Sequence, residues 1–449
     1  MSHNGKDEEI KQANRMRGKK HLKTTQEISQ IVKDYYKERE DKQRSSGQKV
    51  AWCGVAVPKQ PLQAMDVLAY YPEQYGTVVA TRGDPERFIS VAERFGLSRE
   101  MCGYARITLG YILEGFPGDA PLGGMSRPDM LMVTTAVCDT RVKWWELMGE
   151  ILDVPVFILE VPEMPPIGRD GAHILASEME TAGIQIGRRD APHAMGFGAQ
   201  NYGDMFKFLE KVCGRPMDQK KFAGIQKASG RVSKIRREIN EYRKAIPTPM
   251  GSADAFSAMF PGMYMPGTPL ADDFYTRLRG EVRERMEKRI GIVPEERFRL
   301  CWSGIPFWYN MGLINYFEER GGVVVIDTAY GAAALTSGIN PKREPKRWGM
   351  NGMVASVVKA VVDYNCDGAI LSYTPTCRAL YINQLEIQNT LMEELGVPSL
   401  LLESDMVDPS SFNEAQTMTR IDAFIEVIEE KAKRRDWLPN PMPRYGPKE

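Results

Sequence analysis

The chain has 449 residues, of which 43% are hydrophobic and 26% are charged. This length is enough for two or three domains, and the composition is that of an ordinary globular protein. The 59 Lys and Arg residues balance 59 Asp and Glu residues, which argues against a general nucleic-acid-binding surface, because such a surface needs an excess of basic side chains.

Residues 1–48 are predicted to form a basic, mostly helical N-terminal arm. Residues 1–50 hold 13 Lys and Arg against eight Asp and Glu, a net charge of +5. We interpret the arm as a solvated helix or a partner-docking tail. Contact with nucleic acid or an anionic membrane is the alternative, but the first half of the arm lacks the apolar stripe that a membrane helix needs. We therefore expect neither nucleic acid nor membrane as a partner.

The cellular compartment is inferred from apolar runs and cysteines. The first 30 residues lack the apolar core of a secretory signal, and no run of 18 apolar residues predicts a transmembrane helix. Seven cysteines are an odd number in so long a chain. We expect a cytoplasmic protein with free thiols, some of which bind metal.

Residues 49–164 are predicted to form a first α/β domain. Apolar strands alternate with helices of 10–15 residues, which indicates βαβ units and a mostly parallel sheet. Strands are expected at 50–57, 130–137 and 154–160, and helices at 60–68, 85–95, 99–114 and 139–152.

Residues 165–290 form a charged, helix-rich middle segment, with helices expected at 220–243 and 274–290. Between these two helices, residues 258–267 are rich in Met, Gly and Pro and are expected to form a loop. Such a loop either packs over the core or lines a pocket for an apolar substrate.

The strand–helix alternation resumes in residues 291–449, the second predicted α/β domain. Strands are expected at 298–302, 323–327, 369–376 and 398–403, and helices at 308–320, 352–364, 378–395 and 414–433. The predicted fold class is therefore α/β, with two doubly wound parallel-sheet domains of the Rossmann or flavodoxin type, a helical middle segment and a helical N-terminal arm.

Two cysteines occupy matching positions in the two α/β domains. Cys138 and Cys377 each end an apolar strand and open a helix. Ligands of open α/β sheets bind beyond the carboxyl ends of the strands, so the two thiols could face one cleft and hold a metal. The start of a helix also favours a thiolate, because backbone N–H groups and the helix dipole stabilise negative charge.

A third candidate is Cys102, which also precedes a predicted helix. Three thiolates with one open position suit a [4Fe–4S] cluster, although a lone cysteine at such a place is often only a small buried hydrophobe. The other four cysteines, in strands or at helix ends, are interpreted as structural: Cys53, Cys213, Cys301 and Cys366. No phosphate-binding Gly-x-x-x-x-Gly-Lys-Ser/Thr loop occurs, and four histidines do not suggest a His-rich zinc centre or a Ser-His-Asp triad.

Several segments around these cysteines resemble the family of 2-hydroxyacyl-CoA dehydratases and benzoyl-CoA reductases. The resemblance runs in order from about Val50 to Glu430 and leaves the arm outside it. The segments that carry it are Leu68–Glu73, Met101–Gly110, Cys138–Glu146, Cys366–Ala369 with Cys377, and Ser404–Pro409.

The resemblance implies a fold, a cofactor and partners. Such enzymes pair two related subunits, each with three cysteines on a [4Fe–4S] cluster, and by position these would be Cys102, Cys138 and Cys377. A separate iron–sulfur ATPase binds the ATP and activates single electrons that ferredoxin supplies. The substrate is a CoA thioester, which becomes a ketyl-type radical anion. Dehydratases then expel the 2-hydroxyl group, whereas benzoyl-CoA reductases protonate and reduce again.

The resemblance also implies a catalytic residue. Glu73 matches a family position proposed as a base in dehydratases, while a carboxylate that caps a turn is the structural alternative. Dehydratase catalytic subunits carry a serine where this chain has Val55. We therefore favour the large cluster-bearing subunit of an ATP-dependent benzoyl-CoA reductase. The alternatives are a 2-hydroxyacyl-CoA dehydratase subunit, a non-catalytic electron-relay subunit and a structural zinc protein.

Overall fold

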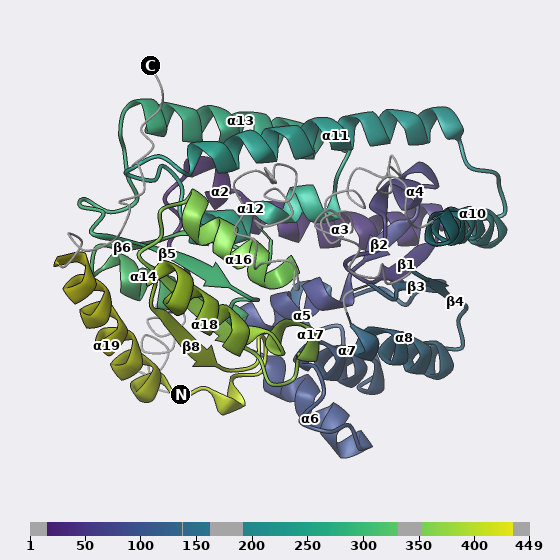
Figure 1. Ribbon diagram of the computed structural model, residues 1–449. Helices are drawn as coiled ribbons and strands as arrows, with labels where there is room; N and C mark the ends of the chain where they lie inside the picture. The colour runs from purple at the N-terminus through teal and green to yellow at the C-terminus, as the bar shows by residue number, and fades with distance from the viewer. Residues whose placement is uncertain (1–15, 137, 162–191, 331–351, 434–449) are drawn as a thin grey trace, which may run out of the picture.

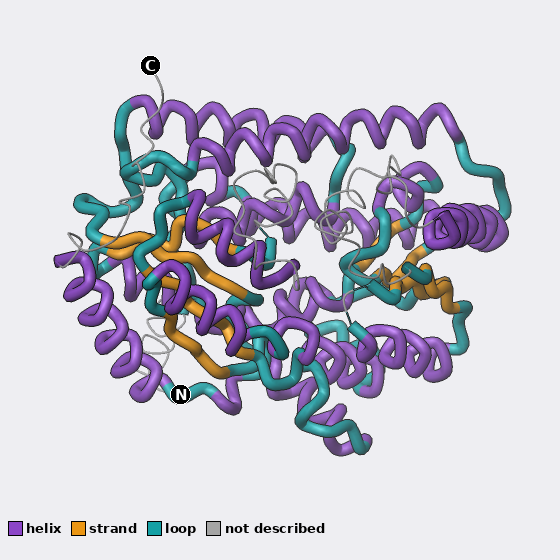
Figure 2. Tube along the Cα trace, viewed as in Figure 1, coloured by secondary structure: helices purple, strands orange, loops and turns teal. Residues whose placement is uncertain are grey.

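The structure is a computed structural model that describes residues 16–136, 138–161, 192–330 and 352–433. Two four-stranded parallel sheets lie side by side in it, with helices around each (Figures 1 and 2). The strands of the first sheet are β1 (Val50–Cys53), β2 (Leu68–Tyr70), β3 (Met130–Thr134) and β4 (Val156–Leu159). Those of the second are β5 (Phe298–Ser303), β6 (Gly322–Asp327), β7 (Gly368–Tyr373) and β8 (Ser399–Glu403).

The two sheets share one topology. The strand order is β2-β1-β3-β4 in the first sheet and β6-β5-β7-β8 in the second, and every pairing is parallel. The direction of winding reverses between β1 and β3 and between β5 and β7, which places a ligand-binding crevice at the carboxyl ends of these strands. The predicted α/β class with two doubly wound sheets is confirmed.

The helices flank and cover these sheets. The N-terminal ones are α2 (Lys23–Gln26) and α3 (Ile28–Ser46). Around the first sheet lie α4 (Lys59–Ala64), α5 (Pro72–Thr81), α6 (Pro85–Phe95), α7 (Gly103–Leu113), η1 (Pro121–Gly123), α8 (Asp139–Leu152) and α10 (Pro192–Cys213). The middle holds α11 (Gln219–Tyr242), α12 (Ser252–Tyr264) and α13 (Pro269–Glu287). Around the second sheet lie η2 (Trp308–Asn310), α14 (Gly312–Glu318), α16 (Gly352–Asp363), α17 (Arg378–Tyr381), α18 (Gln384–Leu395), η4 (Pro409–Ser411) and α19 (Glu414–Lys433).

Helices α11 and α13 run side by side across both sheets (Figure 1). Each buries apolar side chains spaced three or four residues apart, which places these side chains on one face of the helix. The buried positions are Val232, Ile235 and Ile239 in α11 and Phe274, Leu278 and Val282 in α13. This pair forms a layer that connects the two α/β halves.

Two local predictions were wrong. Residues 258–267, expected as a loop, lie largely in α12, since the buried rings of Phe256, Phe260 and Tyr264 recur every four residues on one helical face. The helix expected at 60–68 ends at Ala64, and its last residue, Leu68, begins β2, which pairs with β1. In both places tertiary burial outweighs local composition.

The arm is not a solvated helix along its full length. From α3, the Tyr35 hydroxyl donates to the carbonyl oxygen of Ala69 (2.6 Å), and the Tyr36 hydroxyl donates to Oε1 of Gln74 (2.5 Å). Both tyrosines are 2% exposed. The described part of the arm therefore packs onto the protein through a set of buried side chains, including Leu22, Ile28, Tyr35 and Tyr36. The domain boundaries at 48/49, 164/165 and 290/291 stay predictions.

A second contact ties the arm to the middle segment. The buried carboxylate of Asp254, in α12, accepts hydrogen bonds from the backbone N–H groups of His21 (3.1 Å) and Leu22 (3.2 Å) and from the Thr25 hydroxyl (2.5 Å). These donors lie at the start of α2, where helix N–H groups lack intrahelical partners.

A search of the described helices for a membrane-spanning segment finds none that combines the necessary length with the necessary apolar character.

Replacing Asp254 with Ala should lower the free energy of unfolding by about 2–4 kcal/mol, because it leaves several buried donors without a partner. Urea unfolding followed by circular dichroism measures this change, and limited trypsin digestion should cut residues 16–48 sooner. Asp273→Ala is the control, since that side chain is 67% exposed and should change stability by no more than about 0.5 kcal/mol. Equal stability of the two variants would contradict the anchoring role of Asp254.

Candidate functional site

Each predicted ligand cysteine stands immediately before a helix. Cys138 follows the end of β3 and is the N-cap of α8, and Cys377 follows β7 and is the N-cap of α17. Since β3 and β7 are the third strands of their sheets, these two positions are equivalent in the two topologies. Cys102 is the N-cap of α7, which lies between the two sheets (Figure 1).

The three thiols lie within electrostatic reach of one another. Burial raises the pKa of Cys102 well above its ordinary value, and the charges of Asp405, Cys377 and Cys138 raise this pKa further, whereas a backbone N–H, that of Ala105, lowers it. Burial likewise raises the pKa of Cys377, with an added contribution from the charge of Cys138. The fold thus brings together sulfur atoms that are far apart in sequence.

The remaining cysteines take structural positions. Cys53 and Cys301 lie inside β1 and β5 and are 0% exposed, and Cys366 is buried just before β7. Cys213 ends α10. All seven cysteines are free thiols, and of these four Cys53, Cys301 and Cys366 are buried while Cys213 is half-buried. Their interpretation as structural residues stays a prediction.

The donor set suits an iron–sulfur cluster. Among the described residues, no group of three or more His, Cys, Asp or Glu side chains is placed to hold a metal ion. A [4Fe–4S] cluster is bound differently, since each thiolate takes a separate iron at a corner of a larger body. Three partly buried thiols are the ligand chemistry of such a cluster, and the assignment of Cys102, Cys138 and Cys377 as its ligands stays a prediction.

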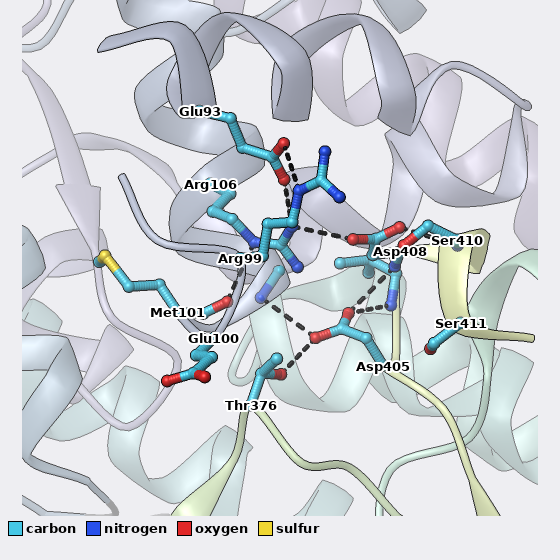
Figure 3. A network of polar contacts seen from close by, with 12 residues as sticks. Glu93, Arg99, Glu100, Met101, Arg106, Thr376, Asp405, Asp408, Ser410 and Ser411 are labelled. Carbon is cyan, nitrogen blue, oxygen red and sulfur yellow. Dashed lines mark hydrogen bonds and ion pairs between the residues drawn. The ribbon is translucent and has the colours of Figure 1, made fainter. Parts of the chain in front are cut away.

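A buried carboxylate links two of the cysteine segments (Figure 3). Asp405, just after β8, accepts hydrogen bonds from the backbone N–H of Gly103 (3.3 Å) and from the Thr376 hydroxyl. Burial raises the pKa of Asp405, while hydrogen bonds from Thr376, Val407 and Asp408 oppose this rise.

Glu73 lies in the first turn of α5, directly after β2, and is 7% exposed. Its Oε1 forms an ion pair with Nη2 of Arg141 at 2.9 Å and lies 3.4 Å from the backbone nitrogen of Val55. Its Oε2 is buried and has no hydrogen-bond partner among the described residues. Glu73 is thus held at one oxygen while the other remains available.

Aromatic side chains surround this carboxylate. Trp308 donates from Nε1 to the Tyr104 hydroxyl (2.6 Å), and Tyr104 also forms a hydrogen bond with Tyr330. The charge of Glu73 raises the pKa of both Tyr330 and Tyr264, although burial is the larger cause for each. The charge of Cys377 also contributes to the raised pKa of Tyr330, so this tyrosine lies within electrostatic range of both Glu73 and Cys377.

Sequence reasoning missed three functional neighbours: Arg141, Asp405 and Tyr330. Arg141 comes three residues after Cys138, one turn along α8. The spacing of a basic residue one turn from a candidate thiol is visible in the sequence and could have pointed to Arg141. Asp405 and Tyr330 follow β8 and β6 at the carboxyl edge of the second sheet, where ligands bind.

Replacing Arg141 with Met should lower the free energy of unfolding by about 3–5 kcal/mol, because it strands the buried Glu73 carboxylate without its partner. The double variant with Glu73→Gln should recover part of that loss, so a double-mutant cycle by urea unfolding measures the coupling. Lys143→Met on the same helix is the control, since that side chain is 80% exposed. Strict additivity of the two changes would contradict the pairing.

Comparison with known proteins identifies a family for this chain. The family model of the 2-hydroxyglutaryl-CoA dehydratase D-component matches residues 53–428. The (R)-phenyllactyl-CoA dehydratase alpha subunit of Clostridium sporogenes is 26% identical over 398 residues, covering 86% of this chain and 91% of that one. A subunit of the benzoyl-CoA reductase of Thauera aromatica is 23% identical over 431 residues, covering 86% of this chain and 90% of that one.

A third relative is the (R)-2-hydroxyisocaproyl-CoA dehydratase alpha subunit of Clostridioides difficile, which is 25% identical over 403 residues, covering 87% of this chain and 93% of that one. These alignments cover both α/β halves, and the family match includes all three predicted ligand cysteines and Glu73. The chain therefore belongs to the family of the 2-hydroxyglutaryl-CoA dehydratase D-component. Its relatives are subunits of 2-hydroxyacyl-CoA dehydratases and of a benzoyl-CoA reductase.

Proposed function

We propose that this chain is the large, cluster-bearing subunit of an ATP-dependent benzoyl-CoA reductase, which reduces an aromatic acyl-CoA thioester by single-electron steps at low potential. The observation that supports the proposal is that residues adjacent to the three cysteines are bonded to common partners. Asp405 accepts from Gly103 and Thr376, and Arg378 forms an ion pair with Asp139 at 2.8 Å. An aromatic thioester needs a donor of very low potential, and the family offers one in its iron–sulfur centre.

The three cysteines are the proposed cluster ligands. When bound, a [4Fe–4S] cluster on three thiolates supplies single electrons and leaves one iron without a protein ligand. Tyr104 and Trp308 are buried and hydrogen-bonded to each other. Buried aromatic groups of this kind would keep water away from the proposed site, which favours the survival of a radical.

Glu73 is the proposed proton-transfer residue. Arg141 holds Oε1 and fixes the side chain, while Oε2 is free to give or take a proton at the substrate. The position of Glu73 at the carboxyl end of β2 places it at the edge of the sheet from which Cys138 also emerges.

Position 55 supports an aryl substrate. Val55 is half-buried, its side chain offers no hydroxyl group, and its backbone nitrogen lies 3.4 Å from Glu73. A hydroxyacyl group would need a polar partner there, whereas a flat ring packs well against valine and the tyrosines.

A 2-hydroxyacyl-CoA dehydratase subunit is the second candidate. It is favoured by the names of the relatives from Clostridium sporogenes and Clostridioides difficile, both of which are dehydratase alpha subunits. Their identities of 26% and 25% differ little from the 23% of the Thauera aromatica reductase subunit, so identity does not separate the two reactions.

The proposed partners follow from the family. The relatives are named as subunits, which supports a hetero-oligomer with a second, related cluster-bearing subunit. An iron–sulfur ATPase would bind the ATP and activate the electrons, with ferredoxin upstream and a CoA thioester as substrate. We place this assembly in the cytoplasm, where thiols stay reduced.

The reaction is tested with the anaerobically purified complex, ATP and reduced ferredoxin. We expect that benzoyl-CoA is consumed and that a cyclic diene is formed. Liquid chromatography with mass spectrometry measures both compounds. Dehydration of a 2-hydroxyacyl-CoA without any arene reduction would assign the chain to the second candidate. Electron passage without turnover of either thioester would indicate a relay subunit.

The ligand set is tested by replacing Cys102, Cys138 and Cys377 one at a time with Ala. Each variant should lose iron, sulfide and activity together, because a cluster with two protein ligands is poorly held. Cys213→Ala is the control and should keep all three. Iron loss in Cys213→Ala equal to that in Cys138→Ala would show that the ligands are wrongly chosen, and zinc in place of iron would identify a structural zinc site.

A further inference from the structure

The loop after β8 carries a buried carboxylate to which the proposed function gives no role. Asp405 is 4% exposed and lies between β8 and η4 (Figure 3). Its Oδ1 accepts hydrogen bonds from the backbone N–H groups of Val407 (2.8 Å) and Asp408 (3.0 Å). These two bonds fix the carboxylate relative to its own loop and leave Oδ2 for other partners.

Oδ2 joins two segments from opposite halves of the chain. It accepts hydrogen bonds from the backbone N–H of Gly103 (3.3 Å) and from the Thr376 hydroxyl. Gly103 directly follows Cys102, and Thr376 directly precedes Cys377. We propose that Asp405 is a positioning residue that holds the Cys102 and Cys377 segments at the separation a shared cluster requires. The proposal deepens the proposed function and rests on it.

The contact at α7 is too tight for any side chain larger than hydrogen. A Cβ atom on Gly103 would lie 2.3 Å from Oδ1 of Asp405 and 2.6 Å from Cγ2 of Val407. Glycine is therefore required beside Cys102 so that the start of α7 can reach the carboxylate. The negative charge of Asp405 also suits this helix terminus, whose first N–H groups carry partial positive charge.

A second set of bonds braces the same junction. Nη1 of Arg106, on α7, forms ion pairs with Asp408 at 2.8 Å and with Glu93 at 3.1 Å. Its Nε donates to the carbonyl oxygen of Met101 (3.0 Å). Both neighbours of Cys102 in sequence are thus tied down, one by Arg106 and the other by Asp405.

The charge of Asp405 has an effect beyond geometry. Its hydrogen bonds to the backbone N–H of Gly103 and to the Thr376 hydroxyl place a carboxylate next to the segments of both Cys102 and Cys377. The same charge opposes the addition of an electron to any centre between them. Removing the charge should therefore shift the midpoint potential of a bound cluster to more positive values. Loss of packing alone predicts no particular sign for such a shift.

The test compares Asp405→Asn and Gly103→Ala with Asp367→Asn as the matched control. Asp367 accepts a hydrogen bond from the backbone N–H of Arg299 (2.8 Å) at the opposite, amino end of the second sheet. The full chain is purified anaerobically with its partner subunit. Iron release to a chelator, the midpoint potential by EPR-monitored titration, and hydrogen exchange of residues 101–106 and 374–380 in metal-free protein are measured.

We expect Asp405→Asn and Gly103→Ala to weaken iron retention by about 10- to 100-fold, and Asp405→Asn to shift the potential of the remaining cluster upward. In metal-free protein both variants should speed hydrogen exchange in both segments, while Asp367→Asn should match the wild type in every measurement. Wild-type iron retention, potential and exchange in Asp405→Asn would overturn the positioning role. Absence of iron from the wild type would reject the proposed function instead, and the metal-free exchange would still decide whether Asp405 joins the two segments.

Discussion

Two parallel sheets of identical topology present their carboxyl edges to a common region, and the candidate site depends on that arrangement. In each sheet the winding reverses beside the first strand, so the third strand ends at a crevice. Cys138 leaves β3 and Cys377 leaves β7 at equivalent places. Cys102 does not follow a strand. It is the N-cap of α7, and the packing of that helix between the sheets brings it toward Cys138 and Cys377.

Buried charges specify how the halves meet. Asp405 joins the segments of Cys102 and Cys377, and the ion pair of Arg106 with Asp408 closes the same junction from α7. Buried ion pairs contribute little net stability, but an alternative packing would leave their charges unpaired, which is costly. We infer that these groups select one relative placement of the two halves, which the apolar surfaces alone would specify less sharply.

The N-terminal helices and the α11–α13 pair support this placement from outside. Tyr35 attaches α3 to β2, and Tyr36 attaches it to α5, the helix that carries Glu73. Asp254 attaches the start of α2 to α12. A residue chosen by sequence for catalysis therefore rests on an arm that the family resemblance did not include. Glu73 is held both by this arm and by Arg141 of α8, the helix that Cys138 caps.

The sequence by itself determined the strand and helix alternation, the doubly wound class and the placement of Cys138 and Cys377 at strand ends, because apolar runs and local periodicity record them. It misjudged residues 258–267, where burial of rings such as Phe260 makes a helix of a segment rich in Gly and Pro. Only the tertiary structure decided that Asp405 meets Gly103, 302 residues away, and that Arg141 pairs with Glu73. Such contacts depend on how separate elements pack, and no local pattern in the chain encodes that packing.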